Sequence, residues 1–156
     1  MRIGVGADIN GYPLKEVVKA HLEALGHEVV DFGVESDEDI DYPLVAEPVA
    51  RAVAAGEVER AVLCCGTGLG MAIVANKVRG VRAAPVSDPY SAERAIRSKD
   101  ARVLCLGALV VGRSVAPLLV DHWLSGEFAG GNSGRKVAQI EDLDQREGAA
   151  RASSAG

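Results

Sequence analysis

The apolar positions of the chain follow two alternating patterns. Short runs rich in Val, Ile, Leu and Cys occur at residues 2–6, 28–32, 61–65, 81–86 and 103–106, with loops of glycine and polar residues after them. Between them lie longer segments, near residues 13–25, 42–55, 70–77, 89–98 and 114–124, whose apolar residues recur at helical spacing. This alternation predicts an α/β fold, a three-layer α/β/α sandwich around a five-stranded parallel sheet.

The carboxyl-terminal part departs from this alternation. Glycines at 130, 131 and 134 precede a segment from 137 to about 147 with the spacing of an amphipathic helix, and residues 148–156 consist mainly of Ala, Ser, Gly and Arg. We therefore expect one domain over residues 1–147 and a disordered tail over 148–156. A chain of 156 residues with 48% apolar residues can bury a core without disulfides or metals.

Charge and composition narrow the function classes. The 17 basic and 22 acidic residues give a net charge of −5, and aromatic residues make up 4% of the chain. This balance argues against a nucleic-acid groove or a polybasic membrane surface, and it favours a small-molecule site or a protein partner. No apolar run approaches the length of a membrane span, and three cysteines are too few for a disulfide framework, so we expect a cytoplasmic protein.

The loops at the carboxyl ends of the strands are where a parallel sheet binds ligands. One of them, after the strand predicted at 61–65, is the glycine-rich turn formed by Gly66, Thr67, Gly68, Leu69 and Gly70. Its backbone amides can approach an anion closely, although such turns also serve close packing alone. It lacks the Gly-Lys-Ser/Thr of a P-loop, and Met71 stands where the dinucleotide fingerprint needs glycine.

Cys65 immediately precedes this turn. The positive end of the helix that follows favours a thiolate there, as a catalytic base or nucleophile requires; the alternative is a small buried apolar side chain. We assign Cys64 and Cys105 to the core, which is the commoner place of a cysteine. Adjacent strand residues point to opposite faces, so Cys64 and Cys65 cannot both line one site. The three histidines fall in or beside predicted helices, so we expect neither a histidine triad nor a metal site.

Several motifs occur in the order found in a known family. They are Gly6-Ala7-Asp8, Asp41-Tyr42-Pro43, Cys65-Gly66-Thr67-Gly68-Leu69-Gly70, Ala75-Asn76-Lys77 and Pro89-Tyr90-Ser91-Ala92. With these motifs the chain resembles the ribose-5-phosphate isomerase B family, which includes the galactose-6-phosphate isomerase subunits, from residue 2 to about 145. The resemblance implies a Rossmann-like fold and interconversion of aldose and ketose phosphates through a cis-enediolate, without a cofactor.

The resemblance also implies roles for individual residues. Cys65 would be the base that moves a proton between C1 and C2. The amides of Gly66, Gly68, Leu69 and Gly70 would hold the enediolate oxygen, and Thr67 would assist the hydroxyl protons. Asp8 would bind sugar hydroxyls, and Tyr42 would line the same pocket. Family members are dimers or tetramers that share sites across subunits, so a homodimer or tetramer is expected.

Six positions depart from the family pattern. Ile9 stands in place of a histidine, with Asn10 next, and Ser98-Lys99 replaces a His-Asn pair whose histidine helps to open the furanose ring. Leu109, Asn132 and Lys136 stand in place of arginines, with Arg135 beside the last. Loss of arginine removes the bidentate fork that suits a phosphate, and lysine restores only a point charge. We expect Asn10, Ser98, Lys99, Arg135 and Lys136 to bind the substrate.

Three functional hypotheses follow from these departures. The first is an isomerase of a short sugar phosphate, such as a tetrulose 4-phosphate, which cannot close the usual five-membered ring and needs no ring-opening histidine. The second keeps ribose 5-phosphate as the substrate, with slower ring opening. The third is a noncatalytic or half-site subunit that pairs with a second homologous chain. Because Cys65 and Thr67 are retained, we prefer the two isomerase hypotheses to the subunit hypothesis.

Overall fold

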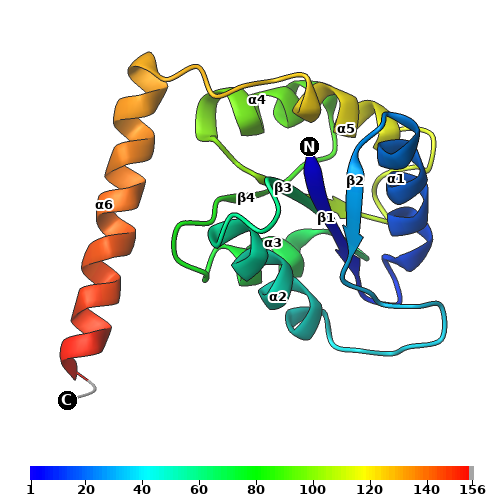
Figure 1. Cartoon of the computed structure of the whole chain (residues 1–156), viewed down its shortest axis with the longest axis horizontal. Helices are drawn as coiled ribbons and strands as arrows, with labels where there is room; N and C mark the ends of the chain where they lie inside the picture. Colours follow the sequence, from blue (N-terminus) through cyan, green and yellow to red (C-terminus); the bar gives the residue numbers. More distant parts are fainter. Residues whose placement is uncertain (155–156) are drawn as a thin grey trace.

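A five-stranded parallel sheet runs through the centre of the computed structural model, which describes residues 1–154 (Figure 1). Its strands are β1 (Arg2–Ala7), β2 (Glu28–Asp31), β3 (Arg60–Cys65), β4 (Ala83–Pro85) and β5 (Val103–Gly107). Their spatial order is β2-β1-β3-β5-β4, and every neighbouring pair is parallel. The predicted sheet is therefore confirmed, and its three central strands read as continuous apolar runs because both faces are covered.

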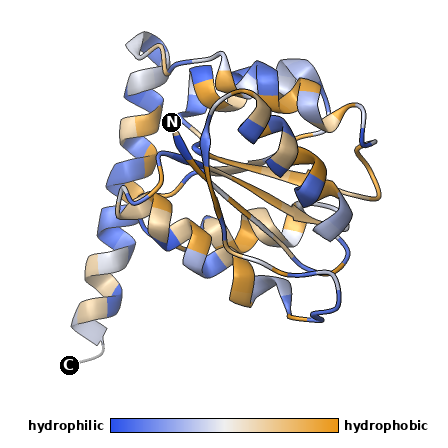
Figure 2. Cartoon of the chain, turned by 45° about the vertical axis from the view of Figure 1, so that its right-hand side comes forward, coloured by the Kyte–Doolittle hydropathy of each residue, from blue (hydrophilic) through white to orange (hydrophobic). Residues whose placement is uncertain are grey.

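Helices cover the sheet on both faces. One core packs β1, β3 and β5 against α1 (Tyr12–Ala24), α4 (Pro89–Lys99) and α5 (Ala116–Leu124). A second core, on the opposite face, packs β3 and β5 against α2 (Tyr42–Ala54) and α3 (Leu69–Ala75). Figure 2 shows the apolar strands enclosed between these helices, whose polar residues face outward. The structure thus confirms the predicted three-layer sandwich.

The last helix differs from its prediction. α6 (Gly131–Ser154) is 24 residues long, so residues 148–154, expected as part of a disordered tail, are helical, while 155 and 156 lie outside the described residues. Alanines at 149, 150 and 152 favour the helix, and the Arg79 side chain packs against Gly148. Among residues 1–154, no helix combines the length and apolar character needed to cross a bilayer.

The order of the strands reverses between β1 and β3. The chain passes from β1 to β2 on one side, and from β3 to β4 and then back to β5 on the other. The loops that leave the carboxyl ends of β1 and β3 therefore diverge to opposite faces, which opens a crevice between them. In the register of the two strands, Ala7 pairs with Cys64, so the Asp8 loop and the glycine-rich turn begin side by side.

A buried ion pair fixes the segment that follows β2. Lys15 on α1 is 2% exposed, and its Nζ donates to Asp31 Oδ1 at 2.9 Å and to the Val34 carbonyl at 3.0 Å. Burial raises the pKa of Asp31, but hydrogen bonds from Lys19, the Gly33 amide and Lys15 outweigh it and leave this pKa below its ordinary value. The ionised carboxylate therefore stabilises the folded chain.

Asp31→Asn is expected to reduce stability near neutral pH by about 3 kcal/mol, because it removes the carboxylate partner of a buried ammonium. A carboxylate with a lowered folded-state pKa contributes stability above its unfolded value, and this contribution is lost as the pH falls below about 4. Chemical denaturation from pH 7 to pH 3 should therefore show a smaller acid-dependent loss for the variant. Asp37→Asn, in an exposed loop, is the control, and equal acid sensitivity in wild type and Asp31→Asn would contradict the assignment.

Candidate active site

Three loops meet at the carboxyl edge of the sheet, after β1, β3 and β5. The Ala108 amide donates to the Cys65 carbonyl at 2.8 Å, and the Leu109 amide donates to the Gly66 carbonyl at 3.0 Å. A Cβ placed on Gly11 would lie 2.2 Å from the Cys64 carbonyl oxygen, so the β1 loop touches the backbone of β3 directly. These contacts hold the glycine-rich turn between the two neighbouring loops.

Cys65 is the last residue of β3 and is 5% exposed. The chain turns back at Gly68, whose φ of +79° is the left-handed conformation that favours glycine. This turn directs the Gly68 amide to the Cys65 Sγ, to which it donates at 3.1 Å. This hydrogen bond holds the Cys65 Sγ at the base of the turn. The thiolate is the form of a cysteine that can accept a proton.

The other two cysteines have different surroundings. Burial raises the pKa of both Cys64 and Cys105 well above the ordinary thiol value, so both remain neutral near pH 7. Cys64 packs in the core beneath α1 and α5, whereas Cys65 packs in the core beneath α2 and α3. The prediction that Cys64 and Cys65 face opposite sides of the sheet is confirmed.

Thr67 lies exposed at the tip of the turn, with Leu69 also exposed two residues later. The Thr67 Oγ1 accepts a hydrogen bond from the Leu69 amide at 3.4 Å. A Cβ on Gly107, at the end of β5, would lie 2.6 Å from the Thr67 carbonyl carbon, so only glycine allows β5 to support the turn this closely. The turn therefore presents the Thr67 hydroxyl and closely spaced backbone amides near Cys65.

Three further predicted residues lie at the same edge. Asp8 is 9% exposed, and its Oδ1 accepts from the Gly11 amide at 2.8 Å, while no described residue donates to its Oδ2. Asn10 is exposed, and its Cβ lies about 4.0 Å from the position that a Cβ on Gly66 would occupy. The Tyr42 ring, at the start of α2, packs against Gly70. The structure thus brings Asp8, Asn10 and Tyr42 to the glycine-rich turn.

The remaining four predicted residues lie elsewhere in this chain. Ser98 and Lys99 end α4, whose C-terminal end lies near the beginning of β4, because the Arg82 Nε donates to the Lys99 carbonyl at 2.9 Å. Arg135 and Lys136 lie exposed near the start of α6. A helix that connects parallel strands runs back along the sheet, so its C-terminal end reaches the amino edge. Within one chain, Ser98 and Lys99 therefore lie away from Cys65, and their predicted role in substrate binding stays a prediction.

An apolar rim surrounds the turn. Ile9, Leu69, Leu109 and Val110 are exposed there, together with Leu44 on α2 and Ile73 on α3. None of the hydrogen bonds or ion pairs of residues 1–154 brings a lysine or arginine to the turn. Contiguous exposed apolar residues of this kind are typical of a contact surface.

Gly11 and Gly107 were not predicted as part of the site. Both hold the turn through close backbone contacts rather than through chemistry of their own. The sequence signal for each was a glycine at or just after the end of a strand, where a second backbone passes closely. Which backbone segment lies against each glycine depends on the tertiary structure, so the sequence could not identify that segment.

Comparisons with known proteins identify the family of this chain. Residues 3–140 match the family described as Ribose/Galactose Isomerase. Ribose-5-P isomerase B of Listeria innocua is 47% identical over 146 residues, which are 94% of this chain and 99% of the relative. D-erythrulose-4-phosphate isomerase of Pectobacterium atrosepticum is 42% identical over 148 residues, covering 94% and 97%.

Solved structures share the whole fold. A ribose-5-phosphate isomerase B from Clostridium thermocellum has a TM-score of 0.92 to this chain at 43% identity, covering 94% of this chain and 99% of that one. A type B ribose 5-phosphate isomerase from Trypanosoma brucei has a TM-score of 0.87 at 36% identity, covering 91% and 97%. The family match, the relatives and the shared fold together establish that this chain belongs to the ribose/galactose isomerase family.

Proposed function

We propose that this isomerase interconverts the aldose and ketose forms of a small sugar phosphate through a cis-enediolate, with Cys65 as the base. The observation that carries the proposal is the Gly68 amide directed at the Cys65 Sγ, 3.1 Å away, inside the glycine-rich turn. Relatives named for ribose 5-phosphate and for erythrulose 4-phosphate support the substrate class.

The reaction needs one base and a place for negative charge. The Cys65 thiolate removes the proton from C2 of the aldose, which leaves a thiol and an enediolate. The amides of residues 66–70 stabilise the charge that develops on oxygen, and the Thr67 hydroxyl transfers a proton between O2 and O1. The thiol then returns its proton to C1, which yields the ketose and regenerates the thiolate.

A second copy of the chain would complete the site. The four residues expected to bind the substrate through polar or positive groups, Ser98, Lys99, Arg135 and Lys136, lie away from their own Cys65, whereas the apolar rim beside Cys65 is open for contact. A homodimer or tetramer with shared sites would cover this rim and supply the phosphate with lysine and arginine. The alternative is that this chain is a noncatalytic or half-site subunit. A different homologous chain then supplies the residues that bind the phosphate.

The sugar is expected to be short or open-chain. Ile9 and Ser98 cannot transfer a proton to a ring oxygen as a histidine can. Overall identity does not choose between substrates, because relatives named for the pentose and the tetrose phosphates are similarly close at 47% and 42%. The side chains at these two positions therefore carry the distinction.

A comparison of two substrates tests the proposal. The purified chain in deuterated water should exchange the C1 or C2 proton of a sugar phosphate, and kcat/KM should be at least about tenfold higher for a tetrulose 4-phosphate than for ribose 5-phosphate, since general acid catalysis of ring opening contributes about 100-fold or more. The reverse ranking would contradict the tetrose assignment. Exchange that begins only after a second homologous chain is added would favour the half-site alternative.

A further inference from the structure

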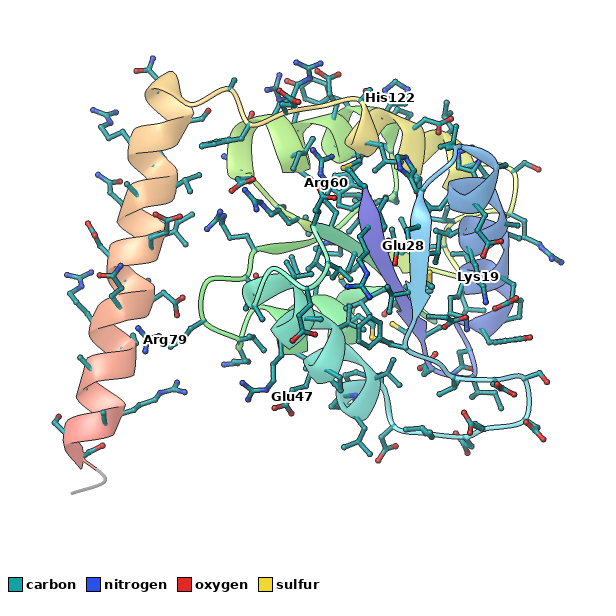
Figure 3. The ribbon with its side chains drawn as sticks, in the orientation of Figure 1. Lys19, Glu28, Glu47, Arg60, Arg79 and His122 are labelled. Atoms are coloured by element: carbon teal, nitrogen blue, oxygen red, sulfur yellow. The ribbon has the colours of Figure 1, made fainter. Side chains whose placement is uncertain are left out.

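α6 is held to the rest of the chain by few contacts. Only one of its residues, Val137, is buried, and Figure 1 shows the helix standing beside the sheet and its covering helices. Its middle and end line a cavity of about 460 Å³ together with residues 76–82. Figure 3 shows Arg79 reaching from the loop before β4 toward the helix. Because little apolar surface fixes α6, its orientation depends on the polar contacts that it makes.

Arg82 makes one of the hydrogen bonds that reach α6 from residues 76–82; the Gly80 amide makes another, to Asp144 Oδ2 at 2.6 Å. Arg82 directly precedes β4 in the chain, and its side chain is 15% exposed. Its Nη2 donates to Asp100 Oδ2 at 2.6 Å, its Nη1 donates to Glu141 Oε1 at 3.2 Å, and its Nε donates to the Lys99 carbonyl at 2.9 Å. One guanidinium thus joins the end of α4 to α6.

The acceptor on the α4 side is itself well fixed. Asp100 ends α4 with a φ of +47°, in the left-handed region, and its side chain is 14% exposed. Its second oxygen accepts from Arg102 at 3.2 Å. Asp100 therefore holds the Arg82 side chain in place, and the hydrogen bond from Arg82 to Glu141 fixes α6 relative to the end of α4.

The two segments that Arg82 joins carry the residues expected to bind the phosphate. Lys99, whose carbonyl accepts from Arg82, directly follows Ser98 at the end of α4. Glu141 lies five positions after Lys136 on α6, about 7.5 Å along the helix axis. A shift of α6 would therefore move Arg135 and Lys136 relative to Lys99.

We infer that Arg82 is a positioning residue for substrate binding: through Asp100 and Glu141 it aligns Lys99 on α4 with Arg135 and Lys136 on α6 as one phosphate-binding surface. The inference rests on the proposed function, in which these three side chains bind the phosphate. Because they act on the non-reacting end of the substrate, the alignment affects KM, whereas proton transfer at Cys65 does not depend on it.

Glu141→Gln is the principal test, because Glu141 is 50% exposed and its loss spares the core. We expect KM for the sugar phosphate to rise about fivefold to twentyfold with kcat within about twofold of wild type, since small misplacements of binding groups cost up to about 100-fold. Arg82→Lys should also raise KM, because one ammonium cannot reproduce the fork that reaches three acceptors.

Glu47→Gln provides the matched control. Glu47 forms an exposed pair with Arg51 on α2 at 2.7 Å and extends from that helix in Figure 3, so its loss should change neither kcat nor KM. If the wild type is active and the KM of Glu141→Gln is unchanged, the positioning role is overturned and the proposed function is not. An equal fall in kcat and kcat/KM in this variant would have the same consequence. A wild type inactive on every sugar phosphate would overturn the proposed function and this inference with it.

Discussion

Cys65→Ala is expected to lower kcat for isomerisation by about 1,000-fold or more, because a positioned general base contributes about 100- to 10,000-fold and this one would act in both proton transfers. The Gly68 amide that donates to the Cys65 Sγ loses its acceptor, but the turn keeps its backbone contacts with the β5 loop. KM should therefore change little. Proton exchange into deuterated water, followed by NMR, measures the step directly.

Cys64→Ala is the matched control for this prediction. Cys64 is adjacent in sequence and fully buried, and burial raises the pKa of its thiol well above the ordinary value, so it has no thiolate to supply. Its removal is expected to lower the free energy of unfolding by about 1 kcal/mol, as for other small deletions in a core, and to leave kcat unchanged. Exchange at the wild-type rate in Cys65→Ala would remove this residue as the base.

Gly11→Ala is expected to lower both stability and activity. The new methyl would lie 2.2 Å from the Cys64 carbonyl oxygen and 2.6 Å from the Cys65 amide nitrogen, so the β1 loop must move away from β3. Overpacking of this kind costs about 1–3 kcal/mol, and a contact with backbone rather than a flexible side chain favours the upper value. The hydrogen bond of 2.8 Å from the Gly11 amide to Asp8 Oδ1 would be strained as well.

The loss of activity in Gly11→Ala follows from the same movement. Asp8 and Asn10 would be displaced from the glycine-rich turn, and misplacement of about 1 Å lowers kcat/KM by about 100-fold. Gly112→Ala is the control, because a Cβ on Gly112 meets nothing within 4 Å and its backbone is not in the left-handed region. Urea denaturation and steady-state kinetics report the two effects, and wild-type values for Gly11→Ala would contradict the close approach.

The strands and the reacting turn could be predicted because their signals are local. Continuous apolar runs at β1, β3 and β5 indicate strands buried on both faces, and glycines at 66, 68 and 70 after such a run indicate a tight turn. The edge strand β4 is shorter than the predicted 81–86, since only Ala83–Pro85 pairs with β5. The helical residues 148–154 were missed because composition alone suggested a tail.

Local patterns along the chain were sufficient to predict the sheet, the cysteine-ended turn and the family, because each depends on neighbouring residues and short-range conformation. Which predicted substrate residues lie at the same edge of the sheet depends on how the helices pack. Asp8 and Tyr42 lie beside the turn, whereas Lys99 lies away from it, since a helix that returns between parallel strands carries its last residues to the opposite edge. The sequence shows which residues are neighbours along the chain, and the packing of the elements determines which residues are in contact.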